Sequence, residues 1–112
     1  MEVDLTKVKV VVLNKVRKWI QGLTDEIAKG QLVGAISKLK KGLKGDWKPV
    51  GDGVYECRLF CSCAYRLYYS ERDPAFLVVM HGNSKGTEKQ QQADIAKAKS
   101  ILAQLKQNNY DK

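Results

Sequence analysis

The chain lacks long apolar runs, has few cysteines and contains a single histidine. None of its hydrophobic stretches approaches the roughly 20 residues that a membrane-spanning helix needs. Its first residues, MEVD, lack the basic and then apolar order of a signal peptide. These absences predict a cytoplasmic protein with no membrane partner. The three cysteines, Cys57, Cys61 and Cys63, are an odd number without a secretory signal, which argues against a disulfide framework.

No metal site or cofactor is predicted. His81 and the three cysteines could supply a Cys3His zinc set, but their spacing fits no common zinc pattern, and Cys57 falls on the core side of a predicted strand. The sequence shows no carboxylate dyad, no Ser-His-Asp set and no P-loop. Small buried or turn thiols are the better interpretation of the cysteines. Any chemistry must therefore come from basic and aromatic side chains.

Length and composition predict one domain over residues 1–112, with residues 107–112 as a frayed tail. The net charge is +8, from 20 basic and 12 acidic residues, which favours an anionic partner. Lysines gather at the end of a predicted helix and in the following loop. The predicted RNA-binding lysines are Lys38, Lys40, Lys41, Lys44 and Lys48, together with Lys89. The alternative is a solvated helix face, because lysines are also favoured near a helix C-terminus.

The pattern of apolar residues and turn signals predicts an α+β fold. We expect a small antiparallel sheet with two N-terminal helices and a C-terminal helix, all covering one face and leaving the other open. The predicted strands are 8–13, 54–61, 64–70 and 76–81, the predicted helices start after Asn14, Thr24 and near Lys89, and residues 46–53 are predicted as a loop. In the second helix the predicted core face is Ile27, Leu32, Ile36, Leu39 and Leu43. Its glycines, Gly30 and Gly34, suggest close packing on a neighbour or a break near Gly30.

Two arginines are expected to face each other across a hairpin. Side chains alternate between the faces of a strand, so a turn through residues 61–63 that aligns the apolar faces places Arg58 opposite Arg66. Directly opposed like charges destabilise a sheet, and a bound anion such as phosphate would remove that cost. Tyr68 shares the face of Arg66, while Lys85 and His81 lie at its rim.

This set of residues suits cleavage of RNA without a metal. RNA carries its own nucleophile, the 2′-hydroxyl, so the protein must accept a proton and stabilise charge at phosphorus. Arginines can clamp phosphate oxygens, and they would lower the pKa of a neighbouring lysine or of Tyr68 so that it could act as a base. His81 could take part in catalysis or be a hydrogen-bonded structural residue. Glu56 fits an ion-pair partner of Arg66 or Arg58 better than a base.

The segments GVYECRL (53–59), YRLYY (65–69) and the strand that ends in His81-Gly82 resemble the RelE/HigB superfamily of toxin–antitoxin toxins. The phage-related host-killer branch is the most similar. The likeness covers residues 14–102 in element order and residues 51–100 in motif detail. The resemblance implies an mRNA endonuclease that acts on ribosome-bound mRNA and is neutralised by a cognate antitoxin, usually a helix-turn-helix protein. It implies catalytic roles for Arg58, Arg66, Tyr68 and Lys85.

The chain departs from the branch pattern in two regions. Residues 61–63 (CSC) replace the usual polar or Gly-rich turn, and the segment after His81 also differs. Asn83 replaces a phenylalanine, Gly86 replaces a lysine, and Gln90 and Gln91 replace Thr-Pro. Two other functions therefore stay open. One is a ParE-like toxin that inhibits DNA gyrase without catalysis on the same fold. The other is a catalytically degenerate relic that only binds an antitoxin.

Overall fold

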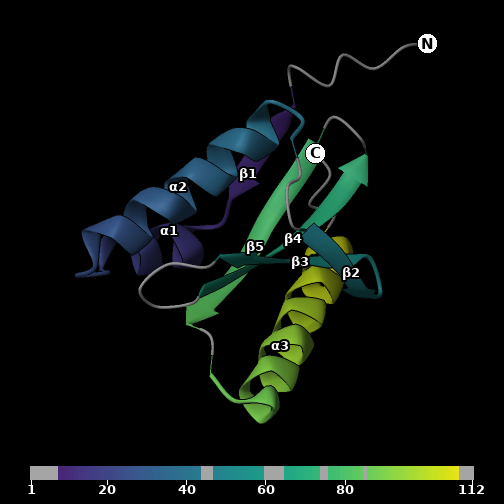
Figure 1. Cartoon of the computed structure of the whole chain (residues 1–112). Coiled ribbons are helices and arrows are strands. Elements are labelled where there is room, and N and C mark those ends of the chain that lie inside the picture. The colour runs from purple at the N-terminus through teal and green to yellow at the C-terminus, as the bar shows by residue number, and fades with distance from the viewer. Residues whose placement is uncertain (1–7, 44–46, 60–64, 74–75, 85, 109–112) are drawn as a thin grey trace.

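The sheet has five strands and helices on both faces (Figure 1). The computed structural model describes residues 8–43, 47–59, 65–73, 76–84 and 86–108. In chain order the elements are β1 (Lys9–Val12), α1 (Asn14–Gln21), α2 (Glu26–Lys40), β2 (Trp47–Gly51), β3 (Val54–Leu59), β4 (Tyr65–Asp73), β5 (Phe76–Ser84) and α3 (Glu88–Gln107). The strand order is β1-β5-β4-β3-β2, with β1 parallel to β5 and the other pairs antiparallel. The predicted α+β class, with two N-terminal helices and one C-terminal helix, is confirmed.

The prediction of an open sheet face is wrong, because α3 covers it. α1 and α2 pack on one face, where Leu32 and Leu39 join Leu67 in the core. α3 packs on the opposite face, where Ala98 and Leu102 contact a second cluster. Residues 65–70 of β4 are accordingly all buried, as in sheets that are covered on both sides.

Residues 47–51 form a strand, where a loop was predicted. β2 pairs with β3 at the sheet edge, with Trp47 opposite Cys57 and Lys48 opposite Glu56. Pro49 is tolerated because an edge strand has one unpaired side. The Gly-Asp-Gly signal marks only the tight turn after β2, where Gly51, Asp52 and Gly53 have φ values of 103°, 54° and 81°.

The second helix differs in detail from the expectation. Asp25, rather than Thr24, caps α2, and its Oδ1 accepts from the backbone amides of Ile27 and Ala28 at 3.1 Å each. The helix runs unbroken through Gly30 and Gly34, and a Cβ at either would meet nothing within 4 Å. Neither a break nor close packing is found there.

Two residues predicted in the core of this region are exposed. Ile27 and Leu43 are 65% and 56% exposed, while Ala28 is fully buried. The buried stripe of α2 therefore runs through Ala28 instead of Ile27, one position around the helix. No helix in the described ranges has the length and apolar character to span a membrane.

Candidate functional site

The strand register brings the predicted site residues onto the face that α3 covers. Arg58 lies opposite Arg66, as predicted, and Arg66 in turn lies opposite Asn83. Tyr68 lies opposite His81 on β5. Arg58 is half-buried, whereas Arg66 is only 4% exposed and Tyr68 is fully buried. The predicted register of the two arginines is thus confirmed, but the prediction that both lie on an exposed face is wrong.

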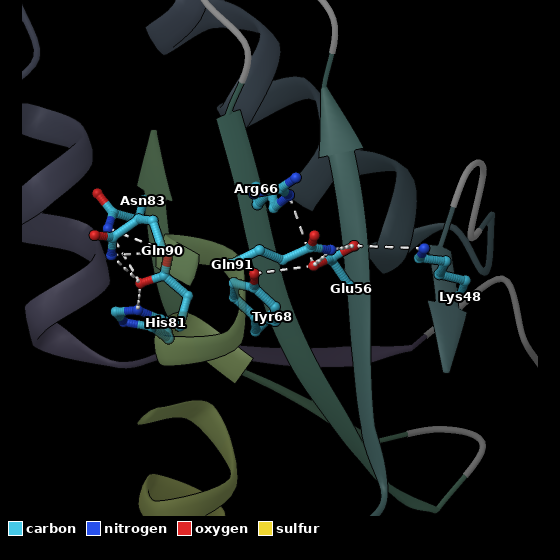
Figure 2. Close-up of polar contacts among 9 residues, drawn as sticks. Lys48, Glu56, Arg66, Tyr68, His81, Asn83, Gln90 and Gln91 are labelled. Carbon is cyan, nitrogen blue, oxygen red and sulfur yellow. Dashed lines mark hydrogen bonds and ion pairs between the residues drawn. The ribbon is translucent and has the colours of Figure 1, made fainter. Parts of the chain in front are cut away.

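Glu56 is the centre of a buried polar cluster (Figure 2). The Tyr68 hydroxyl donates to its Oε2 at 2.9 Å, and Nε2 of Gln91 donates to its two oxygens at 3.0 and 3.2 Å. Nε of Arg66 lies 3.7 Å from Oε2, and Nζ of Lys48 lies 4.0 Å from Oε1. The predicted ion pair between Glu56 and Arg66 is confirmed. A carboxylate of the chain itself therefore offsets the charge repulsion that we expected an external anion to relieve.

The environment of Tyr68 favours the neutral phenol. Burial raises the pKa of Tyr68 first, and the hydrogen bond and negative charge of Glu56 raise it further, while Arg66 lowers it less. The expected lowering of this pKa is wrong, because Glu56 and burial outweigh the arginine. Tyr68 is accordingly a hydrogen-bond donor at neutral pH and lacks the phenolate character of a base.

A second buried carboxylate, Asp94 on α3, holds His81 (Figure 2). Nε2 of His81 lies 2.9 Å from Oδ1 of Asp94. The side-chain amide of Asn83 donates to the same carboxylate at 3.1 and 3.3 Å, and that of Gln90 donates at 3.4 Å to each oxygen. The rings of Tyr68 and His81 stack with centroids 5.7 Å apart and an interplanar angle of 25°, so the two clusters touch.

Three departures from the toxin pattern supply the amides of these clusters. Asn83 and Gln90 donate to Asp94, and Gln91 donates to Glu56. No local sequence pattern indicates these pairings, since Gln91 and Glu56 are 35 positions apart. The bonds of Asn83 and Gln91 attach the first turns of α3 to the sheet, whereas the Gln90 bond lies within α3 and orients the Asp94 carboxylate.

Arg66 keeps unused hydrogen-bonding capacity below α3. Its Nε and Nη1 are buried and have no hydrogen-bond acceptor within the described residues. A guanidinium has five N–H donors, so the ion pair with Glu56 leaves most of them available. This side chain could serve an additional anion if one reached it.

A pocket of about 200 Å³ opens beside His81, between α1, β5 and α3. It lies past the end of β1, which pairs with β5 only from Phe76 to Val79. A Cβ at Gly82 would lie 2.4 Å from the Trp19 ring, so only glycine admits the indole at this position. The lining residues are Lys15, Val16, Trp19, Met80, His81, Gly82, Lys97 and Ile101.

From the sequence, no site role was predicted for Trp19, Lys15 or Lys97. Trp19 does pack on Tyr65, with ring centroids 5.9 Å apart, but it is only partly buried and also lines the pocket. The sequence feature that could have indicated the pocket is one aromatic residue, Trp19, with a lysine on each of two helices. It could not be used without knowing that the two helices meet at the β5 edge.

The structure separates three of the six predicted RNA-binding lysines from this site. Lys38, Lys40 and Lys41 are exposed at the end of α2, next to Val8. That end lies near Phe76, and the path along β5 to His81 spans about 17 Å. Lys48 joins the Glu56 cluster, and Lys89 is exposed in the first turn of α3.

The other predicted residues are Lys44, Lys85 and the three cysteines. Lys44, Lys85, Cys61 and Cys63 lie outside the described residues, and Cys57 is buried. Within the described ranges, no three His, Cys, Asp or Glu residues are grouped so that they could hold a metal ion.

The architecture is that of the RelE-like fold. A double mutant of the E. coli toxin RelE in the free state superposes with a TM-score of 0.58, over 81% of this chain and 97% of that chain, at 13% sequence identity. No protein-family model matches the chain. A Haemophilus influenzae protein, described only as uncharacterized, is 31% identical over 87 residues, which are 78% of this chain and 85% of that protein. The chain belongs to the same family as this Haemophilus protein.

Proposed function

We propose that the protein is the toxin of a toxin–antitoxin pair, of the phage-related branch, and that it cleaves mRNA. The observation that carries the proposal is His81, fixed by a buried carboxylate at the wall of a pocket that two lysines flank. The RelE-like fold supports it, since the similar solved structure is that of a toxin.

His81 is suited to accept the proton of the 2′-hydroxyl. Because the Asp94 carboxylate accepts from Nε2, the neutral ring keeps its lone pair on Nδ1. A base positioned in this way activates the 2′-oxygen, which attacks the adjacent phosphorus and releases the 5′-oxygen. The 5′-oxygen takes up a proton from solvent water as it leaves, so the products are a 2′,3′-cyclic phosphate and a free 5′-hydroxyl.

The arginine pair is suited to bind the phosphate. Arg58 is half-buried and can reach an anion at the surface, while Arg66 has unused donors below α3. The hydrogen bonds from Gln91 to Glu56, which hold α3 over Arg66, can be exchanged for bonds to water or phosphate. Tyr68 orients His81 by ring stacking and stays a neutral donor. Lys85 is proposed as a further cationic contact from the resemblance alone.

The partners follow from the same proposal. An antitoxin of the helix-turn-helix type would neutralise the toxin, and ribosome-bound mRNA in the cytoplasm would be its target. The exposed lysines at the end of α2 are Lys38, Lys40 and Lys41, and they lie about 17 Å along β5 from His81. They suit a sequence-independent contact with structured RNA of the ribosome.

One observation favours a second candidate. Tyr68 is fully buried and Arg66 is 4% exposed, so two of the four residues carried over from the toxin family are inaccessible while α3 is in place. A toxin that inhibits gyrase by binding, or a relic that only binds an antitoxin, does not need these residues exposed.

The decisive experiment is cleavage of a reporter mRNA during translation in vitro, with ends mapped by primer extension. The wild-type protein is expected to create new mRNA ends. EDTA should not inhibit the cleavage step itself, although ribosomes need magnesium to stay intact. His81→Gln keeps a donor for Asp94 but removes the base, so cleavage should fall by about 10²–10⁴. Gln104→Ala, on the exposed side of α3, is the matched control. Intact mRNA with an SOS response in cells would favour the gyrase candidate. If the protein caused neither mRNA cleavage nor an SOS response, the relic candidate would be favoured.

A further inference from the structure

We infer that the pocket between α1, β5 and α3 binds one nucleobase of the RNA and holds its phosphate between Lys15 and Lys97. The inference rests on the proposed function for the identity of the polymer. It assigns a new role to residues outside the arginine face. The pocket would select the base that lies beside the scissile bond.

The size and walls of the pocket fit a single flat ring system. Its volume of about 200 Å³ is below the roughly 300–1,000 Å³ of pockets for drug-sized ligands. Trp19, Met80 and Ile101 give it apolar walls. Every nucleobase has a flat π-face that stacks on an aromatic side chain, and a free phosphate has none.

The position of Trp19 depends on Gly82. A Cβ at Gly82 would lie 2.4 Å from the Trp19 ring and 3.0 Å from the Leu67 side chain. The glycine therefore lets the indole lie against the β5 backbone at the pocket wall. A large aromatic ring that remains half-buried at such a wall is a stacking surface.

The charges around the pocket are of one sign. Lys15 on α1 and Lys97 on α3 are both exposed, and neither forms an ion pair with another described residue. No acidic residue is among the lining side chains. Two unpaired ammonium groups on separate helices can contact one phosphate from two sides.

The pocket also shares a wall with the proposed base. His81 lines it and is fixed by Asp94 at 2.9 Å. A base held against Trp19 would therefore bring its own ribose and phosphate close to the imidazole. This juxtaposition makes the pocket a specificity site of the proposed reaction, since the identity of the bound base would decide where cleavage occurs.

The test uses the full chain labelled with 5-fluorotryptophan, because the sequence has two tryptophans. The ¹⁹F resonance of Trp19 reports on the pocket. That of Trp47 is an internal control, because Trp47 lies on the edge strand β2 and packs on Tyr69 with ring centroids 4.1 Å apart. We expect nucleoside 5′-monophosphates to shift the Trp19 resonance alone, with different affinities for the four bases. Ribose 5-phosphate and inorganic phosphate should leave it unchanged. An equal response to ribose 5-phosphate would mean an anion site only, and no response to any nucleotide would overturn the inference.

Variants of the two lysines test the phosphate contact without touching the core. Lys15→Ala together with Lys97→Ala should weaken nucleotide binding by about tenfold or more. Lys18→Ala, exposed on α1 but outside the pocket lining, is the matched control and should not change it.

Cleavage mapping separates this inference from the proposed function. If the wild-type protein cuts mRNA, the double variant should change the base composition at its cut sites. If the wild-type protein and the double variant cut at identical sites, the inference of a base-selecting pocket would be wrong and the proposed function would remain supported. A response of Trp19 to nucleotides in a protein that never cuts RNA would leave the pocket standing and overturn the function.

Discussion

Gln91 on α3 donates two hydrogen bonds to Glu56 on β3, at 3.0 and 3.2 Å, across 35 positions of sequence. This contact holds the first turns of the C-terminal helix over the arginine face. The carboxylate it reaches is fully buried, so the amide satisfies a group that water cannot reach. The helix is therefore attached by polar bonds at its start and by apolar packing of Ala98 and Leu102 further along.

Gln91→Ala should loosen the start of α3 without unfolding the protein. Glu56 keeps Tyr68 and Arg66 as partners, so the free energy of unfolding should fall by about 1–2 kcal/mol. Amide hydrogen exchange should rise in the first two turns of α3. Gln92→Ala, exposed at the next position, is the control and should change stability by less than about 0.5 kcal/mol.

Arg66→Ala should destabilise the fold, because it leaves Glu56 buried without its guanidinium. Removing one partner of a buried ion pair costs about 3–5 kcal/mol, which urea unfolding would detect. Loss of toxicity in this variant would thus be ambiguous. Arg58→Ala, at a half-buried position, is the informative change for catalysis and should lower cleavage by about 10²–10³ at nearly unchanged stability. Full activity of a folded Arg58→Ala protein would contradict the proposed phosphate contact.

Two glycine substitutions should act in opposite directions. Gly34→Ala in α2 should raise the free energy of unfolding by up to about 1 kcal/mol, because a Cβ there meets nothing within 4 Å and alanine favours the helix. Gly82→Ala should lower it, because the new Cβ would lie 2.4 Å from Trp19. Thermal unfolding of both variants and of the wild type decides the point. A stabilising Gly82→Ala would mean that Trp19 does not lie where the structure places it.

The register of the central hairpin was predictable because strand faces alternate strictly. The opposition of Arg58 and Arg66 needs only that alternation and the alignment of two apolar faces. The packing of α3 on that face could not be predicted from strand alternation. α3 attaches there through Gln91 and Asp94. Both are polar residues on a helix, and in the sequence they resemble residues of a solvated helix face.

The missed strand and the missed pocket have a common physical cause. β2 is a short edge strand that contains a proline, so its residues have a weak intrinsic preference for strand structure. Its pairing with β3 stabilises it as a strand. The pocket depends on α1 and α3 meeting beside β5, which no local pattern encodes. Non-local packing decided both features.

Alkaline pH should destabilise the protein through Tyr68 and Tyr69. Burial is the main cause that raises both pKa values, with Glu56 second for Tyr68 and Glu71 second for Tyr69. Both phenols therefore stay neutral in the folded state above pH 10, where the unfolded chain ionises. Their stabilisation is complete below about pH 10 and is lost as pH rises beyond it, by up to about 1.4 kcal/mol per pH unit for each tyrosine.

Urea unfolding between pH 8 and pH 11 measures this loss, and Tyr68→Phe and Tyr69→Phe should each reduce its slope. At pH 7 the two variants should differ. Tyr68→Phe removes a buried hydrogen bond to Glu56 and should cost about 1–2 kcal/mol. Tyr69→Phe removes a buried hydroxyl with no partner among the described residues and should be nearly neutral. Ionisation of all tyrosines near pH 10 in the folded protein, seen at 295 nm, would contradict the buried placement.

The lysines at the end of α2 should affect RNA affinity and leave the choice of cleavage site unchanged. Lys38, Lys40 and Lys41 are exposed and lie about 17 Å or more along the sheet from His81, so a nucleotide at the pocket cannot contact them. Replacing all three by alanine should lower the salt dependence of RNA binding by about 0.7 in log–log slope for each lost contact on single strands. Lys106→Ala, exposed at the end of α3, is the charge-matched control for a single substitution. An unchanged slope in the triple variant would assign these lysines to a solvated helix end, and a changed cleavage pattern would place them nearer to the site than the structure does.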